Sequence, residues 1–262
     1  MKIAVVTIAY SSTACLSSLF ATASSACPHT IECHLFLHSK YPQIVQECQR
    51  FAQNRSVVYY PFGINRGISR SWNEGMFAAY AARSDVVIIA NDDIVFAPGD
   101  LSKIAQKAAA SRDRYIVSCA GFHQYLNRCI PSLGYACFAI NPIALQRLGC
   151  FDENIFPAYC EDLDYAFRAR LAGLNEENCP NTMLSHVGCN SILSDPTLRR
   201  QNATTHRLNL EYYRRKWGGD DGYETYKRPF NDSRLGFYIS AKYRHGPYGP
   251  GYDRRDHQIV KI

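Results

Sequence analysis

Residues 86–99 read VVIIANDDIVFAPG, an apolar run that stops at an amide and two carboxylates. The segment Val86–Ala90 is rich in β-branched residues and too short for a helix, so it predicts a β-strand. Pro98 and Gly99 stand just before Asp100 and predict a turn followed by the start of a helix. A strand, a polar loop and a helix in this order form one crossover unit of a parallel sheet.

The same alternation recurs along the first half of the chain. We expect strands at 3–9, 33–37, 56–60, 86–90 and 115–119, with helical stretches at 11–26, 41–53, 69–82 and 99–110. This order predicts an α/β fold with a single, mainly parallel sheet flanked by helices. Beyond residue 120 we expect strands at 135–140 and 183–187 and helices at 142–148, 161–172 and 199–216.

Composition excludes several classes of protein. The chain has 262 residues, of which 47% are hydrophobic, and this is enough for a folded core rather than a disordered chain. Its formal charge of +6 fits an anionic ligand, an acidic membrane surface or nucleic acid without choosing among them. No apolar run approaches the roughly 20 residues that a membrane-spanning helix needs. The eleven cysteines are scattered and indicate mostly buried free thiols in a reducing compartment.

The first candidate site is Asn91-Asp92-Asp93, directly after the most apolar strand. In open parallel sheets, ligands bind at the carboxyl ends of the strands. Carboxylates there need a compensating positive charge, and a hard divalent cation prefers oxygen ligands. A helix cap or a turn is an equally weighted interpretation, although a turn needs only one of the two acids.

Two further groups follow later in the chain. Glu161, Asp162 and Asp164 open a helix, where acids complement the helix dipole, but three acids in four residues exceed that need. On a helix, residues 161 and 164 share a face, so one acid of the group can face a pocket as a general base while the others anchor the turn. His186 ends a strand close to Gly188, and a lone histidine there is more often structural than a ligand.

Missing motifs exclude other enzymes. There is no GxGxxG after the first strand and no GxxxxGK[ST], which argues against a dinucleotide oxidoreductase and a P-loop kinase. No GxSxG elbow is present, which argues against a serine hydrolase of the α/β type.

Taken in order, these pieces resemble family 2-type glycosyltransferases of the GT-A fold, particularly the rhamnosyltransferase-like branch. The resemblance covers roughly residues 1–217 and leaves residues 218–262 as an irregular C-terminal extension. Its parts are IAVVTIAY at the start, Asn65-Arg-Gly67 through Trp72-Asn73-Glu-Gly75, IIANDDIVFAPG, the block GCFDENIFPAYCEDLDYAFRARLAG, and SHVG before a helix that ends in KWG.

The resemblance implies an inverting, metal-dependent transferase that moves a hexosyl or deoxyhexosyl group to an acceptor hydroxyl in glycan or polysaccharide synthesis. It implies a UDP-, dTDP- or GDP-linked sugar donor and a Mn²⁺ or Mg²⁺ ion. Asp93 and His186 match metal-binding positions, Asp92 supports them, Asp162 matches the catalytic base, and Glu161 orients the acceptor or the base. The positions that match nucleotide and sugar contacts are Ala9, Tyr10, Asn65, Gly67 and Asn73.

The chain also departs from the family. In the family, the second strand usually ends in an Asp-Asn-x-Ser-like turn, and this chain has Leu37-His38-Ser39-Lys40 there. The resemblance therefore does not identify which residue contacts the nucleotide base. The alternatives are a non-catalytic nucleotide-sugar or carbohydrate-binding module and a sugar nucleotidyltransferase. The second would need a glycine-rich basic loop, and residues 10–18 contain no glycine, arginine or lysine.

The charge distribution suggests partners. Basic residues gather after residue 199, and this segment predicts contact with phosphate, an acceptor lipid or a membrane surface, with an ordinary solvated helix surface as the equal alternative. We expect a glycan, glycolipid or protein acceptor, no nucleic-acid partner, and a cytoplasmic location in which peripheral membrane contact stays open. The basic residues are Arg199, Arg200, Arg207, Arg214, Arg215 and Lys216.

Overall fold

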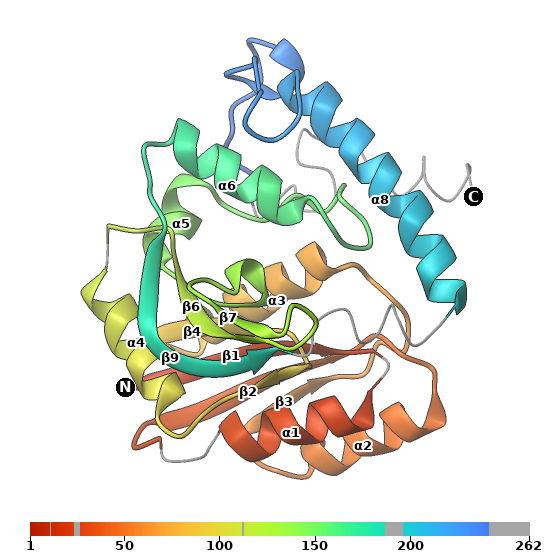
Figure 1. Ribbon diagram of the computed structural model, residues 1–262, viewed down its shortest axis with the longest axis vertical. Helices are drawn as coiled ribbons and strands as arrows, with labels where there is room; N and C mark the ends of the chain where they lie inside the picture. Colours follow the sequence, from red (N-terminus) through yellow and green to blue (C-terminus); the bar gives the residue numbers. More distant parts are fainter. Residues whose placement is uncertain (11, 24–26, 112, 187–195, 241–262) are drawn as a thin grey trace.

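Figure 1 shows the computed structural model of the chain, and the structure describes residues 1–10, 12–23, 27–111, 113–186 and 196–240. Within these residues the strands form one sheet in the order β3-β2-β1-β4-β8-β6-β9-β5, with β7 paired to β6. The strands are β1 (Lys2–Ala9), β2 (Thr30–Leu37), β3 (Val57–Tyr60), β4 (Val86–Ala90), β5 (Ile94–Val95), β6 (Ile116–His123), β7 (Arg128–Ile130), β8 (Cys137–Ile140) and β9 (Glu177–His186).

The predicted mainly parallel sheet flanked by helices is confirmed. Strands β1, β2, β3 and β4 pair in parallel, as do β6 and β9, while β8 is antiparallel to both β4 and β6. Strands β5 and β7 are short antiparallel additions. The helices are α1 (Thr13–Ala23), α2 (Pro42–Ala52), α3 (Ile68–Ala81), α4 (Asp100–Ala110), α5 (Pro142–Arg147), α6 (Glu161–Leu171) and α8 (Pro196–Trp217), with short 3₁₀ turns η1 (Gly134–Ala136) and η2 (Pro229–Asn231).

The core follows the two-residue period of the strands. Alternate residues of β1 and β4, such as Val5 and Ile88, pack with α1 and α4 on one face. Their neighbours, such as Val6 and Ile89, pack with α3, α5 and α6 on the other. Since both faces of the sheet are covered, β4 is apolar throughout, and this is why Val86–Ala90 stands out in the sequence.

Several predicted strands have different limits. Strand β2 begins at Thr30 rather than 33, and β6 ends at His123 rather than 119. Residues 134–136 form η1 rather than the start of the strand expected at 135–140, because Gly134 has a φ of 55° and turns the chain before β8. Strand β9 begins at Glu177 rather than 183. Its pairing with β6 shifts register between Cys119 and Gly121, opposite a stretch that contains Pro180. Proline has no backbone N–H to donate to a neighbouring strand, so its presence argues against a strand in the sequence. The first part of β9 was therefore not predicted.

The described part of the C-terminal extension packs on the rest of the protein. Ile239 is fully buried and forms a bridge with Gly149, with hydrogen bonds from Cys150 N to Ile239 O (2.8 Å) and from Ile239 N to Leu148 O (3.0 Å). Residues 241–262, which complete the extension expected from the sequence, lie outside the described residues, as do Val187 and Gly188 of the SHVG motif. Among the helices of the described part, none is long and apolar enough to cross a membrane.

Seven of the ten described cysteines are buried, and all ten are free thiols, as expected from their scattered spacing. Lys216 is a correction to the predicted basic surface. It is fully buried, whereas Arg199, Arg200, Arg207, Arg214 and Arg215 are exposed.

Candidate active site

A cavity of about 510 Å³ lies at the carboxyl ends of β1 and β4, where the N-terminal ends of α6 and α8 also arrive. In Figure 1, α8 begins at the lower right, toward these strand ends, and rises past the side of α6. The cavity therefore collects segments that are far apart in the chain. The predicted site residues that line it are Tyr10, Asn65, Asp92, Asp93, Glu161, Asp162 and His186.

Strand pairing brings His186 to the acids that follow β4. Ile94 of β5 is the antiparallel partner of His186, so Asp93, one residue earlier, lies beside the imidazole. His186 Nε2 is 3.3 Å from Asp93 Oδ1. Asp93 and His186 are thus in contact although they lie 93 residues apart in the sequence.

A second imidazole adjoins this pair, and sequence analysis missed it. His123 ends β6 and is paired in register with His186 on β9. The two rings meet edge to face with centroids 4.9 Å apart. Nothing in the sequence connects these histidines, because their contact depends on the register of two strands.

Asp92 is buried in an environment that disfavours its charge. Burial, followed by repulsion from Asp93, raises its pKa to about 7, while a hydrogen bond from the Tyr10 backbone acts in the opposite direction. Its Oδ2 is buried and has no hydrogen-bond partner among the described residues. A buried carboxylate oxygen without a partner is the arrangement that a cation or a hydrogen-bond donor from a ligand would satisfy.

Glu161 and Asp162 form a second carboxylate pair at the start of α6. Burial raises the pKa of Glu161 to about 8, with a further contribution from Asp162, and the buried Oε2 of Glu161 has no hydrogen-bond partner within the described chain. Burial also raises the pKa of Asp162, although the backbone N–H of Leu163 donates to its Oδ1 over 2.8 Å. At neutral pH Glu161 is therefore mainly protonated.

The backbone before this pair is unusual. Tyr159 and Cys160 both have positive φ angles, 74° and 76°, which side-chain-bearing residues rarely adopt. Asn209 of α8, fully buried, holds the preceding loop. Its Nδ2 donates to the carbonyls of Ala158 (2.7 Å) and Tyr159 (3.0 Å), and its Oδ1 accepts from Phe156 N (3.3 Å). Helix α8 thus fixes the entry into α6.

Three predicted contact residues do not line the cavity. Ala9 is buried in the cluster between α1, α2 and β2. Asn73 is fully buried and exchanges two hydrogen bonds with the Phe151 backbone, of 3.0 and 2.8 Å. Gly67 is the N-cap of α3 and has a φ of 83°, and a Cβ there would lie 2.8 Å from the Phe156 ring. Gly67 and Asn73 hold the segment that leads to the site.

His38 lines the cavity at the position where the sequence departs from the family pattern. Its Nε2 lies 2.7 Å from Ser71 Oγ. Burial, with a smaller contribution from Arg66, lowers its pKa to about 4, so the imidazole is neutral at physiological pH. The cavity here presents a neutral ring rather than a carboxylate.

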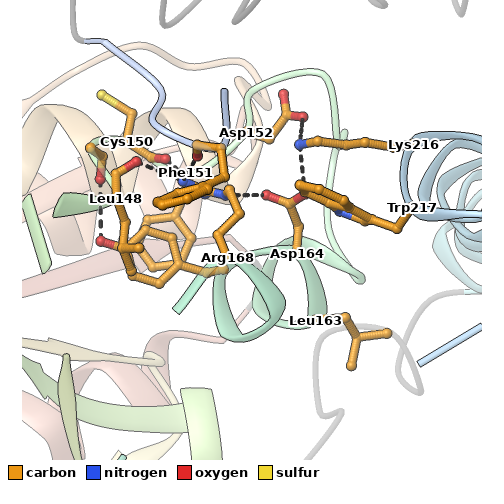
Figure 2. A network of polar contacts seen from close by, with 12 residues as sticks. Leu148, Cys150, Phe151, Asp152, Leu163, Asp164, Arg168, Lys216 and Trp217 are labelled. Carbon is orange, nitrogen blue, oxygen red and sulfur yellow. Dashed lines mark hydrogen bonds and ion pairs between the residues drawn. The ribbon is translucent and has the colours of Figure 1, made fainter. Parts of the chain in front are cut away.

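A buried charge network joins α6 to α8 (Figure 2). Lys216 Nζ lies 2.7 Å from Asp152 Oδ2 and 2.6 Å from Asp164 Oδ1. Arg168 pairs with Asp164 over 2.8 Å and donates to the carbonyls of Leu148 and Cys150. The network joins α6, α8 and the loop between α5 and α6. The residues of this charge network are Asp152, Asp164, Arg168 and Lys216.

Over residues 5–144, more than half of the chain, the sequence matches the family described as glycosyl transferase family 2. The chain belongs to this family. No curated protein matched this glycosyltransferase in sequence.

Solved structures show that the fold of this glycosyltransferase is GT-A. A mannosyltransferase from Pyrobaculum calidifontis, solved with GDP-Man and Mn²⁺, is similar with a TM-score of 0.56 at 15% identity, over 79% of this chain. The glycosyltransferase spans 63% of the length of that protein. Residues 1–349 of S. aureus TarS, in complex with UDP-GlcNAc, are similar with a TM-score of 0.57 at 13% identity, over 85% of this chain and 74% of that one.

The cavity holds side chains that could bind a divalent cation. Within the described residues, no group of three or more His, Cys, Asp and Glu side chains is arranged to hold a metal ion. Asp93 and His186 are in contact, and the Oδ2 of Asp92 is buried without a hydrogen-bond partner among these residues. Oxygen and imidazole ligands of this kind suit Mg²⁺ or Mn²⁺. The residues fit a partial site that a ligand's own oxygens would complete.

Proposed function

We propose that this family 2 glycosyltransferase is an inverting, metal-dependent enzyme that transfers a sugar from a nucleotide-diphosphate-sugar to an acceptor hydroxyl in glycan or polysaccharide synthesis. One observation carries the proposal. Two carboxylate pairs about 70 residues apart, Asp92-Asp93 and Glu161-Asp162, line the same cavity. One pair suits a cation and an anionic donor, and the other suits proton transfer.

Asp93 and His186 would hold the cation, with Asp92 beside them. When bound, a divalent ion stabilises the negative charge that grows on a leaving diphosphate. Mn²⁺ in the mannosyltransferase complex supports this choice of group. Tyr10 and Asn65 would contact the nucleotide, since they line the cavity on the side of the strand ends. The donor is a GDP-, UDP- or dTDP-linked hexose or deoxyhexose.

Asp162 acts as the general base. A base must be ionised to accept a proton. Burial raises the pKa of Asp162, but backbone hydrogen bonds from Leu163, Cys160 and Asp162 itself act in the opposite direction and favour its carboxylate form. The acceptor oxygen attacks the anomeric carbon as its proton passes to Asp162, and the bond from that carbon to the diphosphate oxygen breaks. A single displacement inverts the anomeric centre.

Residues 1–217 form the catalytic unit, and the described part of residues 218–262 packs on it. The acceptor is a glycan, glycolipid or protein. The five exposed arginines of α8 offer a surface for an anionic partner, including a membrane surface, and an ordinary solvated helix face is the equal alternative.

A donor screen tests the proposal. Hydrolysis of UDP-, GDP- and dTDP-sugars is measured with Mn²⁺ or Mg²⁺, and then after exhaustive EDTA treatment. We expect one donor class to be hydrolysed, and activity to be lost with EDTA and in Asp93→Ala. We expect Asp162→Asn to lower transfer at least about a thousandfold, because the base is removed, while donor binding measured by calorimetry changes little.

Two outcomes would reject parts of this mechanism. Comparable transfer by Asp162→Asn would reject the base assignment. Activity unchanged by EDTA or by Asp93→Ala would reject the metal site. A protein that binds a donor but transfers nothing under any condition would be the non-catalytic binding module.

A further inference from the structure

Helix α8 turns a polar stripe toward the protein. Residues spaced three and four apart fall on one face of a helix, and here that face is polar and mostly buried. Its C-terminal half joins the charge network and its middle holds the loop before α6 through Asn209. Its N-terminal end reaches the cavity. The residues of the stripe are Asn202, Thr205, Asn209, Tyr212 and Lys216.

Fixing α8 in this way also fixes one wall of the cavity. Gln201 and Asn202, in the second turn of α8, line the cavity together with Tyr159. The ring of Tyr159 contacts that of His206 on α8, with centroids 5.2 Å apart and planes tilted by 42°. Since Asn209 holds the carbonyl of Tyr159, both the backbone and the ring of this residue are set by α8.

This wall adjoins the proposed base. The backbone N–H of Tyr159 donates to the Glu161 carboxylate, and Asp162 follows directly in the chain. The proposed metal ligand Asp93 comes instead from the end of β4. A molecule lying against Tyr159 and α8 is therefore next to the residues that would take a proton from it.

The side chains of this wall have the chemistry that recognises a neutral sugar. An aromatic ring offers a flat apolar surface for the C–H face of a pyranose. Amide groups both donate and accept hydrogen bonds, as hydroxyl groups require. None of Tyr159, Gln201 and Asn202 carries a charge at neutral pH. Arg199 and Arg200, which precede Gln201 on α8, do not line the cavity.

We propose that Tyr159, Gln201 and Asn202 form the acceptor subsite of this enzyme and that its acceptor presents an uncharged glycosyl residue there. The proposal rests on the proposed function, because it assigns the cavity to a donor and an acceptor together. It adds the class of acceptor and the residues that select it.

The test measures acceptor contact and donor chemistry separately. The full chain, loaded with the nucleoside diphosphate of the donor found above, is mixed with neutral p-nitrophenyl glycosides of glucose, galactose, mannose and N-acetylglucosamine. Saturation-transfer NMR reports binding, and the dependence of transfer on glycoside concentration gives KM. We expect Tyr159→Ala to raise the Kd and KM for the bound glycoside roughly tenfold, and Asn202→Ala to raise them several-fold.

Matched variants separate contact from folding. Tyr159→Phe keeps the ring and should stay within about twofold of the wild type. Arg200→Ala removes an exposed charge one residue before the subsite and should change nothing for a neutral glycoside. Donor hydrolysis without acceptor should be unchanged in Arg200→Ala, and the melting temperature of Tyr159→Ala reports whether its fold is intact.

Three results would overturn the inference while donor hydrolysis still stands. These are binding of none of the glycosides, equal binding by Tyr159→Ala and the wild type, and binding only of phosphorylated glycosides with loss in Arg200→Ala. Failure of donor binding and hydrolysis in the wild type would instead overturn the proposed function.

Discussion

Glu161 and Asp164 lie three residues apart on α6, yet their pKa values are shifted in opposite directions. Burial raises the pKa of Glu161 to about 8. The pKa of Asp164 is lowered although burial alone would raise it, because Lys216 and Arg168 lie against it and Trp217 donates a hydrogen bond. Both carboxyl groups are buried, so burial does not distinguish them. The two pKa values differ because Asp164 has cationic partners, Lys216 and Arg168, whereas the pKa of Glu161 is raised further by a second acid.

The comparison extends to two whole regions. The charge network places two carboxylates against two cations, and each carboxylate accepts further hydrogen bonds (Figure 2). The cavity holds two pairs of carboxylates, with the His186 imidazole beside one of them. Paired buried charge fixes structure, while buried acids that repel each other store an unfavourable free energy that a bound cation or a proton relieves. The second region is therefore the one suited to binding and catalysis.

Breaking the charge network should have the largest effect on stability. Lys216→Met leaves Asp152 and Asp164 without their shared cation, and we expect a loss of about 3–5 kcal/mol in the free energy of unfolding. Urea denaturation at pH 7 measures it. Arg215→Met, one residue away and exposed, is the control and should change stability by less than about 0.5 kcal/mol. Similar losses in both variants would show that the network contributes nothing special.

Replacing a cavity acid by its neutral amide should raise the free energy of unfolding, the opposite of the effect of breaking the charge network. The folded pKa of Glu161, about 8, is above its ordinary value of 4.5, so the folded state binds the extra proton and stability falls as pH rises between these values. We expect Glu161→Gln to raise the free energy of unfolding by about 1–2 kcal/mol at pH 8 and by less at pH 5. Denaturation at both pH values measures this. A gain that is the same at pH 5 and pH 8 would contradict the raised pKa.

Asp92 should show the same behaviour more weakly. Its pKa of about 7 is raised from 3.8, and the gain from Asp92→Asn appears as pH rises from about 4 toward 7. At pH 8 we expect about 1 kcal/mol, which corresponds to a melting temperature roughly 2–4 °C higher. Added Mn²⁺ should stabilise the wild type more than this variant. Destabilisation by Asp92→Asn would place Asp92 with the paired charges of the network.

Much of the fold was predictable because local patterns report it. The alternation of short apolar runs and helical stretches located β1 to β4 and α2 to α4 within three residues. The strand at 135–140 was predicted, but its antiparallel pairing as β8 was not. The short β5 and β7 and the start of β9 were missed, since these segments depend on pairing with other strands. Pro180 and the register shift beside it concealed the last of these.

The sequence showed the two clusters of acids, after β4 and at the start of α6. It did not show which acid of the second cluster faces the cavity. Helical spacing put residues 161 and 164 on one face, whereas the structure places Glu161 and Asp162 on the cavity and Asp164 in the charge network. Asp164 braces the structure, as expected, yet it does so by joining α6 to α8 rather than by capping. Lys216 was grouped with exposed arginines because its partners lie 52 and 64 residues earlier.

The sequence by itself determined the α/β class, the family and the position of the acids at the ends of β4 and the start of α6, because hydrophobic period and motif order are local properties. Only the tertiary structure decided which charges meet. It set His186 beside Asp93 through strand register, and it separated Glu161 from Asp164 by giving a cation to one of them. Ionisation depends on the neighbours of a buried group in space, and those neighbours come from distant parts of the chain.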